Sequence, residues 1–191
     1  RAPAAGGPGG PDRLADAVAR VSRVTHGTDV ALAGAVAVAA AVSAGIDGCT
    51  VEQALETAVR LAPLGAARGH ATSAPDLAGL LRDAVALGRA AGPDGVLDVV
   101  LDRVGTGLAT TESVPATFAV LAAAPADPWL ACRVAASLGG DSDTIAAMAG
   151  AIGGACHGAT GFPTDARTTV ERVNGLDLAG LAAGLLDVRG H

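Results

Sequence analysis

The sequence predicts an all-α domain, and three features of the 191-residue chain support this fold class. Apolar residues recur at the three-to-four-residue spacing of helices in nearly every segment. No stretch of useful length alternates apolar and polar residues, as a half-buried strand would. Ser, Thr or Asp precedes many of the apolar runs and Gly follows them, as at helix starts and stops. We therefore expect a multi-helix bundle that forms a single domain.

The N-terminal half predicts an irregular start followed by four helices. Residues 1–10 contain only Arg, Ala, Gly and Pro, so we expect a disordered tail or linker there and the domain at residues 11–191. The expected helices are one from about Pro11 with Leu14, Val18 and Val21 on one face, one at 30–46, one at 51–61 opened by a capping box of Thr50 and Gln53, and one that starts at Pro75 and Asp76 and ends before Gly92.

The C-terminal half predicts six further helices from the same kinds of boundary residue. They are a short helix at 95–105, one capped by Ser113 with Pro115 in its first turn, one capped by Asp127 with Pro128 at its first position, one at 142–157 ended by Gly158, and two at about 166–173 and 178–188 separated by Asn174 and Gly175.

Composition excludes several classes of function. Half of the residues are hydrophobic, but there are two Phe, one Trp and no Tyr, so stacking surfaces for nucleic acid are scarce. All 13 basic residues are Arg and the net charge is -6, which argues against capture of nucleic acid or anionic membrane lipid. The three widely spaced cysteines form no CxxC pair, and no secretory signal opens the chain, so we expect free thiols and a cytoplasmic location.

Residues 30–46 are apolar enough to suggest a membrane span. The run is of about minimum spanning length, is dominated by Ala, and is bracketed by Asp29 and Asp47. A helix that is apolar on every side is more simply the central buried helix of a bundle, and we expect no contact with a membrane.

The string "GGDSDT", residues 139–144, allows two interpretations. In the first, Asp141 is a helix N-cap and Asp143 is an acid in the first turn, where the helix dipole favours carboxylates. In the second, Asp141, Asp143 and Thr144 supply oxygen ligands to a hard divalent cation. A cap needs only one carboxylate, so the second carboxylate with an adjacent hydroxyl favours the metal site.

These three side chains cannot complete a metal site alone. Mg²⁺ takes about six oxygens, so water, substrate and another acidic segment must supply the rest. The chain offers no convincing second segment: Asp94, Asp98 and Asp102 share one helix face, but this pattern is more typical of a solvated stripe.

The sequence resembles the ADP-ribosylglycohydrolase family in three segments. "GGDSDTIAAMAGAIGGACHG" followed by "GFP" resembles the C-terminal signature of that family. "SRVTHGTDVALAGAVAVAAAV" resembles its Thr-His segment, and "VGTGLATTESVPATFAVLAA" resembles the segment leading to its Ser-Val-Pro helix. The matches keep the family's order and span about residues 12–188.

The resemblance implies an all-α fold with two Mg²⁺ or Mn²⁺ ions that are held in part by Asp141, Asp143 and Thr144. It also implies hydrolysis of the bond between ADP-ribose and an acceptor such as arginine or serine, with the metals orienting ribose hydroxyls and a water. Further positions match residues that line the family's substrate pocket: His26, Gly107, Leu108 and Gly140. A loop histidine satisfied near the next helix is the alternative for His26.

The chain departs from the family at its N-terminal side. Members carry an acid/base residue and a Thr/Ser-Asp-Asp metal cluster there, whereas this sequence contains no Asp-Asp pair. The resemblance therefore implies a C-terminal portion that lacks the family's N-terminal part and hydrolyses substrate only with a partner that carries the cluster. The alternatives are a non-catalytic relative that binds ADP-ribose or a nucleotide, and an enzyme acting on a different glycoside or phosphorylated metabolite.

Overall fold

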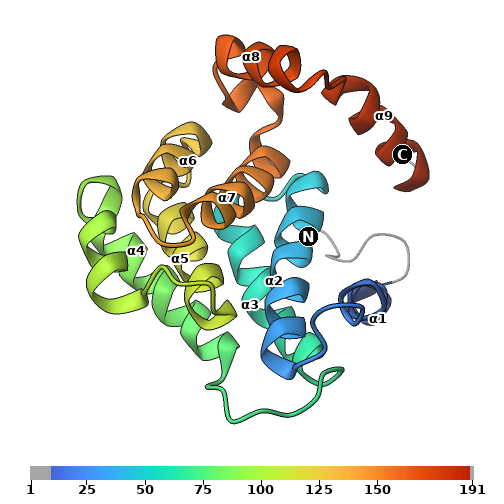
Figure 1. Cartoon of the computed structure of the whole chain (residues 1–191), viewed down its shortest axis with the longest axis vertical. Coiled ribbons are helices and arrows are strands. Elements are labelled where there is room, and N and C mark those ends of the chain that lie inside the picture. The colour runs from blue at the N-terminus through green and yellow to red at the C-terminus, as the bar shows by residue number, and fades with distance from the viewer. Residues whose placement is uncertain (1–9, 190–191) are drawn as a thin grey trace.

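The computed structural model describes residues 10–189, and within this range it contains helices and no strand, which confirms the all-α class (Figure 1). The expected tail at residues 1–9 lies outside the described residues, whereas Gly10, also assigned to the tail, begins the first helix. The elements are α1 (Gly10–Ser22), α2 (Asp29–Ile46), α3 (Val51–Ala66), α4 (Leu77–Val99), the π-helical turn η1 (Val100–Val104), α5 (Thr110–Ala123), α6 (Pro128–Ser137), α7 (Ser142–His157), the 3₁₀ turn η2 (Ala159–Gly161), α8 (Thr164–Asn174) and α9 (Leu178–Arg189).

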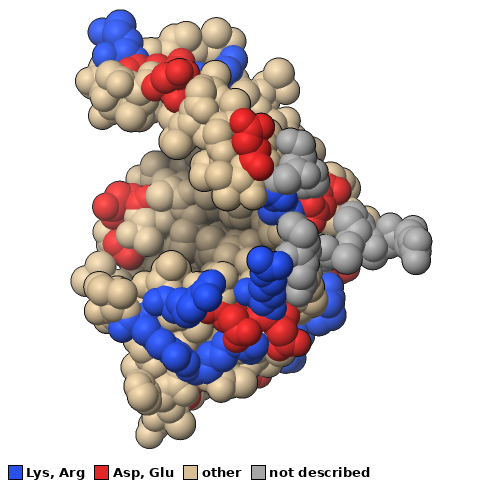
Figure 2. Space-filling view, turned by 90° about the vertical axis from the view of Figure 1, so that its right-hand side faces the viewer, with Lys and Arg blue, Asp and Glu red and all other residues tan. Residues whose placement is uncertain are grey.

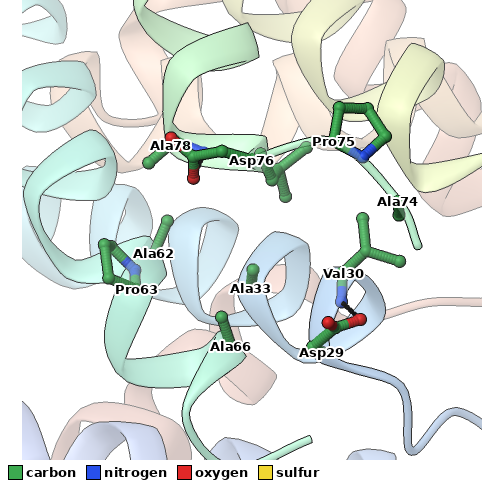
Figure 3. Close-up of a pocket in the computed structure, with 11 residues that line it drawn as sticks. Asp29, Val30, Ala33, Ala62, Pro63, Ala66, Ala74, Pro75, Asp76 and Ala78 are labelled. Carbon is green, nitrogen blue, oxygen red and sulfur yellow. Dashed lines mark hydrogen bonds between the residues drawn. The ribbon is translucent and has the colours of Figure 1, made fainter. Parts of the chain in front are cut away.

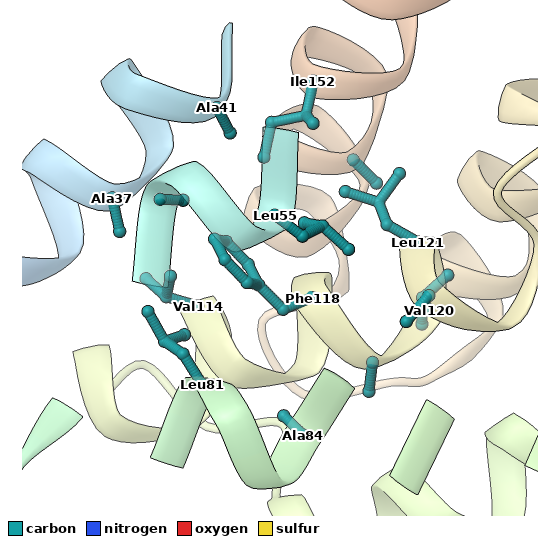
Figure 4. Packing of buried hydrophobic residues seen from close by; sticks show 14 of the residues in the cluster. Ala37, Ala41, Leu55, Leu81, Ala84, Val114, Phe118, Val120, Leu121 and Ile152 are labelled. Atoms are coloured by element: carbon teal, nitrogen blue, oxygen red, sulfur yellow. The ribbon is translucent and has the colours of Figure 1, made fainter. Parts of the chain in front are cut away.

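The hydrophobic core lies between α2, α3, α4, α5 and α7. Helix α2 packs along α3 and α7, while α5 packs along α4 and α7. Phe118 of α5 is fully buried, and Figure 4 shows it among Leu55, Leu81 and Val114, which belong to the same buried cluster. Burying such a phenylalanine and its neighbours contributes about 1.5–3 kcal/mol per side chain.

Small residues let two pairs of helices cross with their backbones in contact. A Cβ atom added at Gly65 of α3 would overlap the carbonyl of Leu32 in α2. One added at Gly88 of α4 would overlap the carbonyl of Ala119 in α5. The Ala- and Gly-rich composition is therefore used for close helix approach.

Helix α2 is the buried central helix that its composition predicts. In the described part of the chain it is the one helix long and apolar enough to span a membrane by length and composition. Ten of its eighteen residues are buried against neighbouring helices. The helix therefore fills the role of a core element of the bundle.

Most local boundary predictions are confirmed. The capping box opens α3, since the Gln53 amide donates to the Thr50 hydroxyl and the Thr50 amide donates to the Gln53 side chain at 3.0 Å. The Asp127 carboxylate caps α6 by accepting the Leu130 amide at 2.9 Å. Helix α7 ends at Gly158, whose φ of 70° favours glycine.

One boundary prediction is wrong. Ser113 is not an N-cap, because α5 begins three residues earlier and the Ser113 hydroxyl donates to the Ala109 carbonyl within the helix. The break predicted at Gly92 is present, because Gly92 has a non-helical backbone with a φ of 64° that divides α4 into two helical segments, and the second segment ends in the π-helical turn. The acids of this region, Asp94, Asp98 and Asp102, are exposed, as predicted for a solvated stripe.

Helices α8 and α9 extend away from the rest of the molecule (Figure 1). Neither contains a buried residue. The end of α9 is tied to the end of α2, because the Arg189 guanidinium donates to the Asp47 carboxylate at 2.6 Å and to the Ser43 hydroxyl at 3.2 Å. We refer to residues 164–189 as the C-terminal arm.

Candidate metal and substrate site

The loop before α5 is shaped by a carboxylate at the start of that helix. The Glu112 side chain accepts the Gly107 amide proton at an N···O distance of 2.8 Å. Gly105 has a φ of 95°, and an added Cβ there would lie 2.5 Å from the same carboxylate oxygen. Glycines at 105 and 107 therefore allow the loop to close around Glu112.

This loop in turn holds the start of α7. The Asp141 amide donates to the Thr106 carbonyl at 2.7 Å. Gly140, with a φ of 61°, packs so closely that an added Cβ would overlap the same carbonyl. A chain of contacts thus links Glu112 through Gly107 and Thr106 to the backbone of Asp141.

The side chains of the aspartate motif do not act as a helix cap. The Asp141 carboxylate accepts no amide proton of the first turn of α7 and instead accepts the Thr144 hydroxyl proton at 2.9 Å. Asp143 is exposed and makes no hydrogen bond or ion pair with any residue between 10 and 189. Asp141 therefore occupies the predicted N-cap position of α7 without capping it through its side chain, and both carboxylates retain oxygens that can bind a cation.

His26 lies on the wall of a cavity of about 490 Å³ beside α2. Its Nδ1 lies 2.8 Å from the Thr25 hydroxyl, and the side chain is exposed. The cavity is bordered by α1, α2, the start of α5 and α7, and its walls are mostly apolar: they include Val18, Ala31, Ala35, Val38, Val114 and Met148.

The cavity lies close to the aspartate motif. Met148 lines it and follows Thr144 by four residues on α7, which is one helical turn and a rise of about 6 Å. Thr110, the first residue of α5, lines it too. The Thr-His segment, the segment leading to the Ser-Val-Pro helix and the aspartate signature therefore border one region.

Three of the predicted substrate residues are placed differently. Gly107, Leu108 and Gly140 do not line the cavity that contains His26. The Gly107 amide is occupied by Glu112, and Leu108 is 86% exposed. They lie on the two loops beside Asp141.

Sequence reasoning missed Glu112 and Thr106, which position those two loops. A signal was present for Glu112, because an acid in the first helical turn follows the Gly-Thr-Gly string by a few residues. Nothing in the sequence indicates that the Thr106 carbonyl contacts Asp141, since this contact joins loops far apart in the chain.

A second acidic pair borders a smaller cavity of about 100 Å³ (Figure 3). The Asp29 carboxylate accepts the Thr72 hydroxyl and amide protons at 2.7 and 2.9 Å, and these bonds lower the pKa of Asp29. The Asp76 carboxylate caps α4 by accepting the amides of Ala78 and Gly79. Asp29 therefore ties the loop at Thr72 to the first turn of α2, and Asp76 fixes the start of α4.

The donor atoms of the aspartate motif suit a hard cation but are too few. Two carboxylates and a hydroxyl are oxygen donors of the kind that Mg²⁺ and Mn²⁺ prefer. Between residues 10 and 189, no three His, Cys, Asp or Glu side chains are grouped closely enough to hold an ion. The residues fit one part of a divalent-metal site.

The chain matches a known family over its whole length. The family model described as ADP-ribosylglycohydrolase matches residues 1–191. The chain is 36% identical over 179 residues to "Uncharacterized protein YegU" of Escherichia coli (strain K12), an alignment that covers 93% of this chain and 54% of that protein. The chain thus spans about half the length of this curated relative. No solved structure matches it.

Proposed function

The chain belongs to the ADP-ribosylglycohydrolase family, and we propose that it forms the C-terminal part of a divalent-metal-dependent hydrolase that cleaves the glycosidic bond between ADP-ribose and an acceptor. We assign the remaining metal ligands to an N-terminal complement with a Thr/Ser-Asp-Asp cluster, because the chain spans only half of its relative. We place this activity in the cytoplasm, where the three cysteines would remain free, as they are in the structure.

The observation that carries this proposal is the state of the two motif carboxylates. Asp143 is exposed and makes no hydrogen bond or ion pair between residues 10 and 189, and Asp141 leaves the amides of α7 uncapped. A purely structural aspartate at a helix start accepts one or two of those amides, as Asp76 and Asp127 do. Because Asp141 and Asp143 do not accept the amides of α7, their carboxylates are available to bind a cation.

The residues that would hold the metals are Asp141, Asp143 and Thr144, together with ligands of the complement. Two bound Mg²⁺ or Mn²⁺ ions would supply Lewis-acid polarisation of a water and a template for the ribose hydroxyls. The Glu112 carboxylate keeps the Gly107 loop, and through it the Asp141 backbone, at a fixed position. Such fixed placement of ligands favours binding, since less order has to be created when the ion binds.

The cavity beside the motif is the proposed site for part of the ADP-ribose. His26 lies on its wall, where its ring nitrogens can donate or accept a hydrogen bond. Leu108, Gly107 and Gly140 are proposed to approach the ribose from the loops beside Asp141. The mainly apolar walls suit an aromatic base or ribose face better than a phosphate.

The decisive experiment compares Asp143→Asn with Asp94→Asn, a control at an exposed acid outside the motif. Each variant is co-purified with the part of the relative that has no counterpart here, and bound Mn²⁺ is counted. We expect Asp143→Asn to lose at least one ion while its melting temperature stays within about 1–2 °C, since Asp143 makes no internal contact.

Other outcomes separate the alternatives. Unchanged Mn²⁺ content in Asp143→Asn would contradict the metal role, as would two ions bound by the chain without any complement. ADP-ribose binding by calorimetry, with no release of ADP-ribose from modified arginine or serine, would indicate the non-catalytic relative. His26→Ala should weaken ADP-ribose binding and leave the ion count unchanged.

A further inference from the structure

The loop that carries His26 has little packing of its own. It joins α1 to α2 at residues 23–28, and its first four residues are exposed. Within the loop, the His26 amide donates to the Ser22 carbonyl at 2.7 Å, and Nδ1 of the ring lies 2.8 Å from the Thr25 hydroxyl. Exposed loops with few buried contacts open readily in solution. A fixed position of the His26 ring therefore requires support from outside the loop.

A segment from far along the chain supplies this support. Residues 68–72, which come just after α3 and which we call the strap, form an isolated parallel β-bridge with the start of α2. The His70 amide donates to the Gly27 carbonyl, and the His70 carbonyl accepts the Asp29 amide, both at 2.9 Å. Two backbone hydrogen bonds thus hold the residues that directly follow His26.

The Asp29 carboxylate locks the far end of the strap. It accepts the Thr72 hydroxyl proton at 2.7 Å and the Thr72 amide proton at 2.9 Å, so both of its oxygens are engaged. The same carboxylate accepts the Val30 amide proton at 2.7 Å at the start of α2 (Figure 3). Hydrogen bonds to a charged acceptor are about twice as strong as those between neutral groups. Asp29 therefore joins the strap and the helix at one point.

The near end of the strap is tied to α1 and to the His26 loop. The Arg68 guanidinium donates to the carboxylates of Asp16 and Asp12 in α1, at 2.6 and 3.0 Å. The Arg68 carbonyl accepts a proton from the guanidinium of Arg23, the first residue of the loop, at 2.7 Å. On the face that carries α1, acidic and basic side chains lie side by side below a hollow (Figure 2). Both ends of the strap are thus anchored.

A glycine lets the strap lie directly on the chain beneath it. A Cβ atom added at Gly69 would overlap the backbone of Thr28 and Asp29. One added at Gly27 would lie 3.6 Å from the His70 ring, which is ordinary van der Waals contact. The close approach at Gly69 leaves no room for a side chain between the two segments, so movement of the strap displaces the loop.

We propose that the strap is a positioning element of the substrate site, and that Asp29 and Thr72 are positioning residues that act on ADP-ribose binding through His26. This inference rests on the proposed function, in which His26 binds part of the ADP-ribose. The strap keeps the His26 ring on the wall of the 490 Å³ cavity, which neither Asp29 nor Thr72 lines. A ring held in place loses less freedom on binding than a mobile one, which favours affinity.

The test compares three variants of the full chain that each change one threonine. Thr72→Val removes the hydroxyl that binds the Asp29 carboxylate and keeps the size of the side chain. Thr72→Ser keeps the hydroxyl without the methyl group. Thr50→Val is the matched control, because it removes an exposed hydroxyl at the start of α3, at the opposite end of that helix from the strap. Thr72 is exposed, so an unchanged thermal transition will show that each variant folds.

Hydrogen exchange and histidine NMR on the chain alone measure the position of the loop. In Thr72→Val, the two backbone amides that bridge the strap and the loop should exchange about fivefold faster than in the wild type. The His26 ring signals should shift or broaden, while those of His157, which lies where α7 crosses the far end of α2, should not change. At the strap and at His26, Thr72→Ser and Thr50→Val should behave like the wild type.

Calorimetry with ADP-ribose measures the consequence for the substrate, in the co-purified complex that tests the proposed function. Thr72→Val should weaken ADP-ribose binding about fivefold. The Mn²⁺ count should stay unchanged, since no hydrogen bond between residues 10 and 189 links the strap to the aspartate motif. Thr72→Ser should restore the affinity. ADP-ribose should in turn slow exchange of the His70 amide, because it fixes the loop that the strap supports.

Several results would overturn the positioning role. These are unchanged exchange of the bridging amides in Thr72→Val, unchanged His26 ring signals, an equal loss of affinity in Thr50→Val, or an affinity that Thr72→Ser does not restore. Failure of the proposed function looks different: the loop loosens in Thr72→Val, but the wild type and the variant alike bind no ADP-ribose. Exchange and ring signals of the chain alone then still decide whether the strap holds the loop.

Discussion

Helix α5 buries eleven of its fourteen residues, whereas α9, with twelve residues and a larger share of Ala and Leu, buries none. Helix α5 lies between α4 and α7 and places Phe118 in the core, while α9 is held mainly at its end by Arg189. Apolar composition thus does not decide whether a helix is buried; the presence of a packing partner does. The helical body of the molecule, residues 10–161, and the C-terminal arm should therefore respond differently to the same kinds of substitution.

The largest difference is expected for loss of an apolar side chain. Phe118→Ala should lower the free energy of unfolding by about 3–5 kcal/mol, because it opens a cavity in a close-packed core. Leu185→Ala, in the arm, should change it by less than about 0.5 kcal/mol. Urea denaturation of both variants measures this. A comparable loss for Leu185→Ala would mean that α9 is packed in solution without a complement.

The second difference concerns thiol reactivity. Burial, followed by the proximity of Cys49 and Glu52, raises the pKa of Cys156 to about 11. A cysteine introduced on the arm by Leu181→Cys would be exposed and keep an ordinary pKa of about 8.5. At pH 8 it should react with iodoacetamide about a hundredfold faster than Cys156, because only the thiolate attacks.

Site-resolved mass spectrometry measures both thiol rates in the same molecule. The rate at Cys156 should rise as the pH approaches 11, since the acid form with the raised pKa loses its proton only there. Equal rates at pH 8 would show that Cys156 is as accessible and as acidic as a thiol on the arm.

The smallest of the expected differences lies within the helical body, at the loop before α5, which borders the aspartate motif. Glu112→Ala removes the acceptor of the Gly107 amide and should cost about 1–2 kcal/mol of stability. Hydrogen exchange at the Asp141 amide should accelerate, because its acceptor, the Thr106 carbonyl, belongs to the released loop. Glu112→Gln keeps a carbonyl acceptor and serves as the control. Unchanged exchange at Asp141 would show that the two loops are held independently.

Local features of the fold were predictable from the sequence because their causes are local. The capping box of Thr50 and Gln53 and the Asp127 cap each depend on residues within one turn, and all are present. Ser113 was assigned wrongly because its hydroxyl has two ways to be satisfied, and the Ala109 carbonyl four residues earlier was as suitable as a capped amide.

The candidate site was predictable only in part. The types of residue at Asp141, Asp143 and Thr144 indicated a hard-cation site, since that chemistry is encoded in the side chains themselves. The contact between Thr106 and Asp141 joins two backbones, so no side-chain pattern records it. The exposure of the arm was equally hidden, because α9 has the composition of a buried helix.

The backbone contacts at Gly65 and Gly88 set limits on which sequences this fold can accept. Any other residue at either position would place a Cβ atom on a carbonyl of the neighbouring helix. In a saturation library selected for folded protein, these two codons should retain glycine, while the codon for the exposed Asp94 should tolerate most replacements. Positions at which two helices cross without side chains between them are therefore the positions that tolerate the fewest substitutions.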